Sequence, residues 1–272
     1  MKRKISLIFS LVLMTTAFSS CGKKEKIEEV SIESLSSQSE DQVIDIDVNE
    51  GVDLYTSAFS KISKLSNYTL IHDTLISYTG ENSADIKQKD KLFYVEGNIY
   101  YESGGTATDP EGNTVQLDAK QSWLENNVYY QKYTYEEYND QFYKEEMTLD
   151  TLLPLLIDPM QEDIKFLQDT ITKASSRTKD GQVYLLFTFD IEKYNEYVNS
   201  EQSDIAISSA EMNLQLDSSG NLVKVTSNSI GTVNNTNVNI EESVLLRDID
   251  STTITALTEK EKEVYIDVDA VN

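Results

Sequence analysis

Few side chains in this 272-residue chain belong to the types that perform covalent or acid–base chemistry near neutral pH. The chain has one cysteine, Cys21, and one histidine, His72. A single thiol excludes a disulfide within the chain and any cysteine-rich zinc module, and a single imidazole excludes a site with several histidine ligands. A Ser-His-Asp triad would depend on His72 alone, and no G-x-S-x-G motif accompanies it. We therefore expect His72 to be a structural residue of a strand.

Carboxylates are abundant, but their pattern does not indicate a catalytic or metal site. With 47 Asp and Glu residues, pairs that resemble glycosidase carboxylates arise by chance. Asp45, Asp47 and Asn49 imitate the start of a calcium loop, but Glu50 replaces the turn glycine and Thr56 stands where a bidentate Glu is required. No glycine-rich phosphate loop is present in the sequence. The sequence therefore predicts no enzyme activity, no metal and no cofactor.

The charge balance excludes two classes of partner. The 23 Lys and Arg residues give a formal net charge of −24. Nucleic acid binding needs basic side chains that neutralise phosphates, so we expect no nucleic acid partner. Adsorption to an anionic membrane surface through charge alone is excluded for the same reason.

The surroundings of Cys21 point to a role for its thiol. Lys2, Arg3 and Lys4 precede an apolar run over residues 5–18, which is shorter than the roughly 20 residues of a membrane-spanning helix. Two small residues then lead directly to the cysteine, which Gly22 follows. A signal peptide of this kind resembles the lipobox of bacterial lipoproteins, although Phe18 stands where Leu is commonest. The alternative is an ordinary secretory signal with an incidental cysteine.

The lipoprotein resemblance implies a location. In that family the cysteine thiol receives a diacylglyceryl group and becomes the new N-terminus after cleavage. Two acyl chains anchor a protein stably, each buried CH₂ contributing about 0.8 kcal/mol. We therefore expect lipidation at Cys21 and a chain held on the outer, extracytoplasmic face of a bacterial cell membrane.

The chain divides into four segments. Residues 1–20 form the signal peptide, and the lipidated Cys21 opens an acidic tether over 21–52 whose composition is too polar and charged for a core. A folded domain follows over 53–257, and 258–272 is a charged tail. Because no Pro- or Gly-rich linker interrupts the domain, we expect a single folded unit. We also expect the chain to be a monomer.

Hydrophobic periodicity predicts an α+β domain. Asp53 is placed to cap a first helix, and a second helix over 147–158 has Thr148 as its cap and Pro154 as a point of kinking or early ending. A short third helix follows Asp190. From Tyr68 onward most other segments alternate with a period of two, including residues 164–178, which we predict as a strand.

Tight turns separate the predicted strands. The turn signals stand at residues 97–98, 109–113, 125–127, 179–182 and 218–221. Strands that succeed one another through such short turns pair antiparallel.

This order of elements resembles the LolA/LppX/LprG half-barrel group, similar domains of which occur in Gram-positive lipoproteins of unassigned function. The resemblance rests on the segments LYTSAFSKISKLSNYTL, SWLENNVYYQKYT, MTLDTLLPLLI and DSSGNLVKV, and it covers about residues 53–250. It implies a single curved antiparallel sheet, an incomplete β-barrel, wrapping two or three helices. It also implies a lipid or other hydrophobic small-molecule ligand between sheet and helices.

Two functions follow from these observations. In the first, an apolar or amphipathic ligand occupies a pocket lined or gated by apolar residues of the two helical segments, namely Leu54, Ala58, Ile62, Leu65, Leu149, Leu152, Leu153 and Leu156. In the second, the core is closed and the domain is a non-catalytic interaction module for envelope or wall components. A carrier needs several hundred Å³ of apolar space, so cavity volume separates the two.

A cluster of tyrosines bears on the second function. Six of them fall in one short acidic region, namely Tyr129, Tyr130, Tyr133, Tyr135, Tyr138 and Tyr143. They predict either aromatic packing between strands or a platform that stacks on sugars or on a partner surface.

Overall fold

The computed structural model describes Ile32, Leu35 and residues 41–80, 83–135, 138–199 and 205–268. The predicted signal peptide at 1–20, the lipidation residue Cys21 and most of the predicted tether at 21–52 lie outside these residues. No helix within the described ranges is long and apolar enough to cross a membrane.

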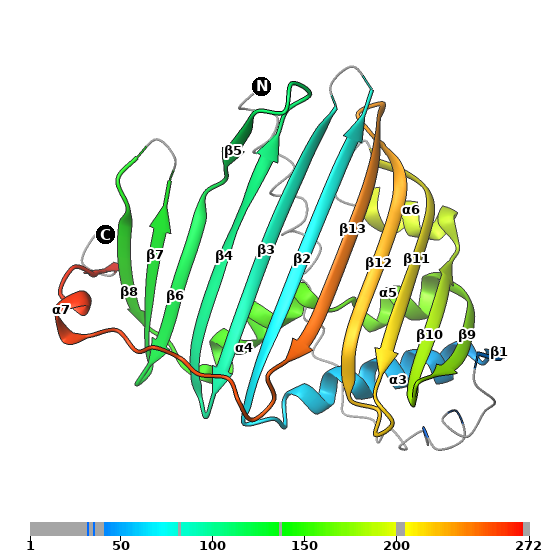
Figure 1. Ribbon diagram of the computed structural model, residues 1–272, viewed down its shortest axis with the longest axis horizontal. Helices are drawn as coiled ribbons and strands as arrows, with labels where there is room; N and C mark the ends of the chain where they lie inside the picture. The colour runs from blue at the N-terminus through cyan, green and yellow to red at the C-terminus, as the bar shows by residue number, and fades with distance from the viewer. Residues whose placement is uncertain are drawn as a thin grey trace.

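Across the described residues, fourteen strands form one large curled sheet (Figure 1). Their order across the sheet is β1-β9-β10-β11-β12-β13-β2-β3-β4-β6-β7-β8-β14, and β5 pairs with β4. The strands are β1 (Val43–Ile46), β2 (Asn67–Thr79), β3 (Ala84–Val95), β4 (Asn98–Thr108), β5 (Thr114–Gln116), β6 (Ala119–Glu125), β7 (Val128–Thr134), β8 (Gln141–Glu146), β9 (Ile171–Lys179), β10 (Gln182–Phe189), β11 (Ile205–Leu216), β12 (Leu222–Val233), β13 (Thr236–Arg247) and β14 (Ile266–Asp267).

All pairings are antiparallel except that of β14 with β8. The strand order ends in β1 on one side and in β14 on the other, so the sheet is unclosed. The prediction of an α+β chain built on a single curved, mainly antiparallel sheet is confirmed at this level.

The helices of the described residues are α3 (Val48–Ile62), α4 (Leu149–Ile157), the 3₁₀ turn η1 (Asp158–Met160), α5 (Ile164–Thr170), α6 (Ile191–Asn199) and α7 (Glu259–Lys262). In Figure 1, α3, α4, α5 and α6 lie behind the strands. Leu54 of α3 and Leu167 of α5 share one buried cluster with Leu70, Leu92 and Leu214 of the sheet.

We call the sheet face that carries Leu70, Leu92 and Leu214 the helix face, and the opposite face the open face. Side chains alternate between the two faces along a strand. Asp73 of β2, Lys89 of β3 and Asn213 of β11 stand an odd number of positions from the leucine of their own strand, so they belong to the open face.

Helix α3 begins earlier than the sequence predicts. Asp47 is its N-cap, and the Asp47 carboxylate accepts hydrogen bonds from the backbone N–H groups of Asn49, at 2.9 Å, and Glu50. Asp53, the predicted cap, lies inside the helix. Together with the pairing of β1 and β9, this start places the beginning of the folded part before residue 53. The apolar face extends back through the buried Val52 to Val48, which packs partly buried against the core, so one more turn joins the helix.

Two other helices differ from expectation. Residues 164–170, predicted as strand, form α5, because Asp163 caps the backbone N–H of Phe166 at 2.9 Å and Phe166 and Leu167 are buried on one side. A seven-residue helix is too short to show a helical period in sequence. Helix α4 has Thr148 as its N-cap, as predicted, and it continues past Pro154 to Ile157.

Three hairpin turns lie within one residue of the predicted turn signals, the first at Glu96–Gly97 where the signal stands at 97–98. The pairs Glu96–Gly97, Asn126–Asn127 and Asp180–Gly181 all have positive φ angles and connect adjacent antiparallel strands. Two consecutive residues with positive φ define the tight turns that match strand twist, and Gly or Asn adopts them at low cost.

The C-terminal residues Asp248–Asp267, here called the C-terminal strap, cross the open face near the lower strand ends (Figure 1). The Asn67 side chain binds Thr252 through the Thr252 backbone N–H and carbonyl, at 2.8 and 2.9 Å. Glu125 accepts a hydrogen bond from the backbone of Leu257 and pairs with Lys262 at 3.0 Å. The predicted charged tail at 258–272 thus contains α7 and β14 and is attached to the sheet as far as it is described.

Candidate functional site

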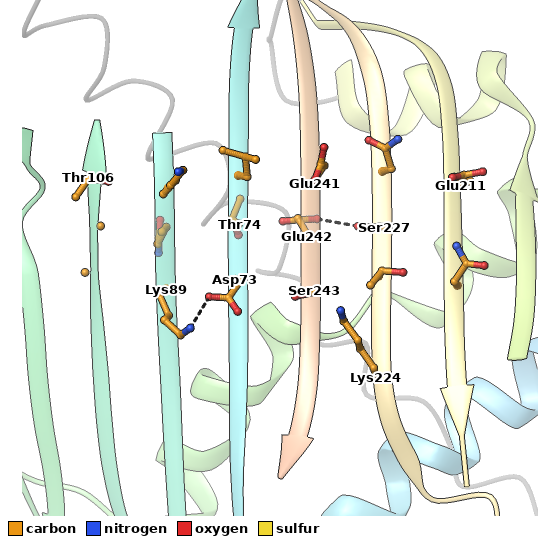
Figure 2. Close-up of a pocket in the computed structure, with 18 of the residues that line it drawn as sticks. Asp73, Thr74, Lys89, Thr106, Glu211, Lys224, Ser227, Glu241, Glu242 and Ser243 are labelled. Atoms are coloured by element: carbon orange, nitrogen blue, oxygen red, sulfur yellow. Dashed lines mark hydrogen bonds and ion pairs between the residues drawn. The ribbon is translucent and has the colours of Figure 1, made fainter. Parts of the chain in front are cut away.

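A groove of about 780 Å³ lies on the open face of the sheet. It crosses six neighbouring strands, from β11 through β12, β13, β2 and β3 to β4 (Figure 2). The register explains why these residues meet: Asp73 lies opposite Lys89 on one side and Ser243 on the other, and Ser243 lies opposite Thr226. The groove is therefore built from residues that lie beside one another at equivalent positions along these six strands.

Polar and charged side chains line this groove. Asp73 and Lys89 form an ion pair at 3.1 Å, drawn as a dashed line in Figure 2. Lys87 and Lys224 add positive charge, and the carboxylates come from Glu211, Glu241 and Glu242. Leu75 is its one large apolar lining residue among those described. Such a lining suits a polar ligand that offers both hydrogen-bond donors and acceptors.

One lining group lacks a hydrogen-bond partner within the described structure. The side-chain oxygen of Asn228 is buried and accepts no hydrogen bond. An unsatisfied buried acceptor costs free energy. The Asn228 oxygen is such an acceptor, and it lies beneath the surface of the groove.

Aromatic side chains continue the open face beside the groove. Phe93, Tyr100, Trp123 and Tyr130 are cross-strand neighbours on β3, β4, β6 and β7, and we call them the aromatic row. Ring centroids are 5.4 Å apart for Phe93 and Tyr100, and 5.1 Å apart for Tyr100 and Trp123. All four rings are only partly buried.

A single pair separates the aromatic row from the groove. Lys91 and Glu102 form an ion pair two residues from Phe93 and Tyr100 along their strands, and two residues from Lys89 and Gly104 in the other direction. The Tyr100 hydroxyl donates to Glu102 at 2.9 Å, which ties the row to this pair. Groove and aromatic row therefore form one continuous surface.

A second, smaller cavity of about 190 Å³ lies between the helix face and the elements η1, α5 and α6. Its walls combine apolar and aromatic residues with His72, Glu162 and Glu242. The volume falls below the several hundred Å³ that we expected of a lipid carrier.

His72 is buried on the helix face between two carboxylates. Its Nδ1 is 3.7 Å from Asp90 and its Nε2 is 3.8 Å from Glu242. Burial lowers the pKa of His72, but the adjacent carboxylates of Asp90 and Glu242 outweigh this and raise that pKa above its usual 6.5. Asp90 also accepts hydrogen bonds from Gln88 and from the Tyr101 hydroxyl. The arrangement is a buried network of charged and hydrogen-bonding groups, and the structural role of His72 stays a prediction.

Glu162 is the most perturbed carboxyl group in the described structure. Burial, and secondarily the negative charge of Glu242, raise the pKa of Glu162 to about 7. The backbone N–H of Glu162 donates to the Tyr55 hydroxyl at 2.7 Å, which holds this segment against α3.

The residues predicted to bind a ligand line neither hollow. Leu54, Ala58, Ile62, Leu152 and Leu156 are buried in the main hydrophobic core, and Leu65, Leu149 and Leu153 pack partly buried against it. The structure brings all eight together under the sheet, as core. Their contact with a ligand stays a prediction, and Cys21 lies outside the described residues.

The tyrosine cluster divides between the two faces. Tyr129, Tyr133 and Tyr143 lie on the helix face, while Tyr130 alternates with them on the open face. Sequence reasoning missed Phe93, Tyr100 and Trp123, which join Tyr130 from three other strands. The available signal was their parity within predicted hairpins, because residues at equivalent positions of paired strands share a face.

No group of three or more His, Cys, Asp or Glu side chains suited to a metal ion occurs among the described residues. No family model and no curated protein matches the chain. Among solved structures, one match is an N-terminal dehydratase from the difficidin assembly line, with 8% identity over 83% of this chain and 90% of that chain, and a TM-score of 0.11. A TM-score at this level carries no argument about fold or activity.

Proposed function

We propose that this chain is a lipid-anchored lipoprotein of the bacterial envelope and a non-catalytic binding module. Its open face would bind a polar glycan. The lipobox-like sequence ending at Cys21 supports the anchor, and the groove continuous with the aromatic row supports the glycan site.

The observation that carries the ligand class is the combination of the two surfaces. Sugars present hydroxyl groups, which pair with mixed donors and acceptors such as those of the groove, and apolar ring faces, which stack on aromatic side chains. The aromatic row would supply stacking through Phe93, Tyr100 and Trp123, whereas Tyr130 already packs edge-on against Tyr265. Asp73 and Lys89 would supply polar contacts. The net charge of −24 favours a neutral or zwitterionic glycan over a polyanion.

Binding to soluble oligosaccharides tests this function. Chitohexaose and cellohexaose would be titrated into the full chain by calorimetry. Replacement Trp123→Ala should weaken binding by about 0.5–1.5 kcal/mol, because it removes a stacking ring. Tyr138→Ala removes a more exposed ring outside the row and should leave binding unchanged. Absence of binding to both sugars, or equal binding by the Trp123 variant, would contradict the proposal.

The anchor has its own test. Replacement Cys21→Ser removes the thiol that would carry the diacylglyceryl group, so the variant should remain an unlipidated precursor or be shed into the medium. Metabolic labelling with a fatty acid should mark the wild-type chain only. Equal labelling of the variant would refute lipidation at Cys21.

A second candidate is the carriage of an apolar or amphipathic ligand between sheet and helices. It is supported by the half-barrel resemblance and by the cavity at α5 and α6, which has Met160, Phe166 and Ile205 in its walls. This candidate also requires that the sheet be an incomplete barrel wrapped around the helices. Native mass spectrometry of the full chain, with and without bacterial lipids, separates it from the glycan module by the presence or absence of a retained lipid.

A further inference from the structure

The cavity between the helix face and α5 and α6 has aromatic walls. The Phe166 ring lies 5.2 Å from that of Tyr194 and 4.6 Å from that of Tyr197, measured between centroids, and Phe166 and Tyr194 also contact Phe189. Phe166, Tyr194 and Tyr197 all line the cavity, and they come from two different helices. Three aromatic rings from two helices therefore meet in the wall of one small hollow.

The same cavity carries an excess of negative charge. Glu162, Asp163 and Glu242 line it, and His72 is the single basic group among the described lining residues. His72 is already placed between Glu242 and Asp90, at 3.8 and 3.7 Å. No ion pair of the Glu162 carboxylate occurs within the described structure. One imidazole thus faces several carboxylates.

A cation that fits this cavity must interact with both kinds of wall. Ammonium groups are attracted to aromatic faces and to carboxylates, whereas a bare metal ion needs a set of ligating side chains that the described residues do not provide here. The volume of about 190 Å³ is below the roughly 300–1,000 Å³ of pockets for drug-sized molecules. A small molecule with a few carbon atoms around the charge fits both size and lining.

We propose that this cavity binds a small organic cation, an alkylammonium or quaternary ammonium compound, held between the carboxylates of Glu162 and Glu242 and the rings of Phe166, Tyr194 and Tyr197. Glu162 and the three rings line only this cavity, whereas Glu242 lines both the cavity and the groove.

Proton linkage provides a signature of the site. The pKa of Glu162 is raised to about 7 by burial and by Glu242, so its carboxyl group is largely protonated at pH 6. A cation bound beside Glu162 favours the ionised carboxylate, so binding at pH 6 should release a proton. A purely hydrophobic ligand disfavours the ionised carboxylate and would release no proton from Glu162; His72, the other titratable group beside Glu242 in this cavity, is the same for both kinds of ligand.

Calorimetry with two cations and two neutral counterparts tests the proposal. Tetramethylammonium and n-butylammonium would be compared with tert-butanol and 1-butanol, using the full chain at pH 6 in buffers of different ionisation enthalpy. At least one of the two cations should bind with proton release, and neither alcohol should bind. Binding of the alcohols as tight as that of the cations, or no binding of either cation, would overturn the proposal.

Charge-neutral variants locate the site. Glu162→Gln and Glu242→Gln should each weaken cation binding by about tenfold or more, as removal of a charge from a desolvated site does. Glu241→Gln is the matched control, because Glu241 is the neighbour of Glu242 on β13 and belongs to the open face. Thermal melts would establish that each variant folds. If both Gln variants fold and bind like wild type, the assignment is refuted.

Discussion

At the level of single residues, the described structure concentrates its perturbed ionisable groups on the helix face. The raised pKa of His72 stabilises the fold below pH 6.5, and this contribution is lost as the pH rises through the raised value. Asp90 has a lowered pKa, because its contacts with His72 and Ser103 outweigh burial, so its contribution is lost on acidification. The pair therefore loses its stabilising effect at high pH, where His72 loses its proton, and at low pH, where Asp90 gains one.

Glu162 leads to a prediction about pH. Its pKa rises from 4.5 to about 7 on folding, so between these values the folded chain holds a proton that the unfolded chain has released. Stability therefore falls as the pH rises through this window, by at most about 1.4 kcal/mol per pH unit. Glu162→Gln removes this fall, so the variant should gain stability relative to wild type from pH 5 to pH 7. Urea denaturation at each pH measures the difference.

Two observations decide this prediction. Glu241→Gln, on the open face, should give a stability curve parallel to that of wild type across the same range. Parallel curves for wild type and the Glu162 variant as well would show that Glu162 ionises normally in the folded chain.

At the level of elements, helix α4 shows how closed the interface between helices and sheet is. Leu152 is 2% exposed in the core, whereas Leu155, three residues later, is 61% exposed. Leu152→Gln should therefore destabilise the chain by about 2–5 kcal/mol, because it buries an amide in an apolar site. Leu155→Gln on the same helix should change stability by about 0.5 kcal/mol or less. Chemical denaturation measures both, and similar values for the two variants would argue against a closed core at α4.

Strand β4 contains a neighbouring pair of glycines with different constraints. A Cβ atom at Gly105 would overlap the carbonyl oxygen of Lys87 on β3, whereas at Gly104 it would make an ordinary contact 3.5 Å from Ala119. Gly105 therefore permits the close approach of the β3 and β4 backbones at this point.

Alanine replacements test this difference. Gly105→Ala should lower the free energy of unfolding by about 1–3 kcal/mol, because backbone must move to relieve the overlap. Gly104→Ala, one residue away, should be nearly neutral. Thermal and urea melts compare them, and equal stabilities would mean that the close approach to Lys87 relaxes without cost.

At the level of the whole molecule, both ends of the described chain are attached to the sheet. Strand β1 pairs with β9, with an ion pair of Asp45 and Lys173 at 2.9 Å, and Asp47 caps α3. At the other end, the C-terminal strap crosses the open face and buries Tyr265. The sheet therefore depends on segments that sequence composition places outside the domain.

Truncation should reveal this dependence. A chain that begins at Gly51 lacks β1 and the Asp47 cap, and loss of a cap alone costs about 1 kcal/mol. It should melt several degrees below a chain that begins at Gln42, since about 2–4 °C accompany each kcal/mol in a domain of this size. Calorimetric melts measure the difference. Coincident melts would show that β1 and the cap contribute nothing to stability.

Much of the local structure could be predicted from sequence. The adjacent residues Asn126 and Asn127 predict a hairpin turn, because a tight turn depends on the residues within it. In the structure both have positive φ. The apolar face of α3 and the cap at Thr148 are equally local signals. The scarcity of thiol and imidazole groups is visible in composition alone, and so is the large negative charge.

The two hollows depend on the tertiary structure. Phe93, Tyr100 and Trp123 come from three strands, and the lateral register of β3, β4 and β6 aligns them on one face. The cavity near Glu162 likewise exists because α5 and α6 pack over strands that precede and follow them in sequence. Leucines that line a pocket and leucines that fill a core have the same sequence pattern, because hydrophobic periodicity records which side of an element is buried and not what buries it.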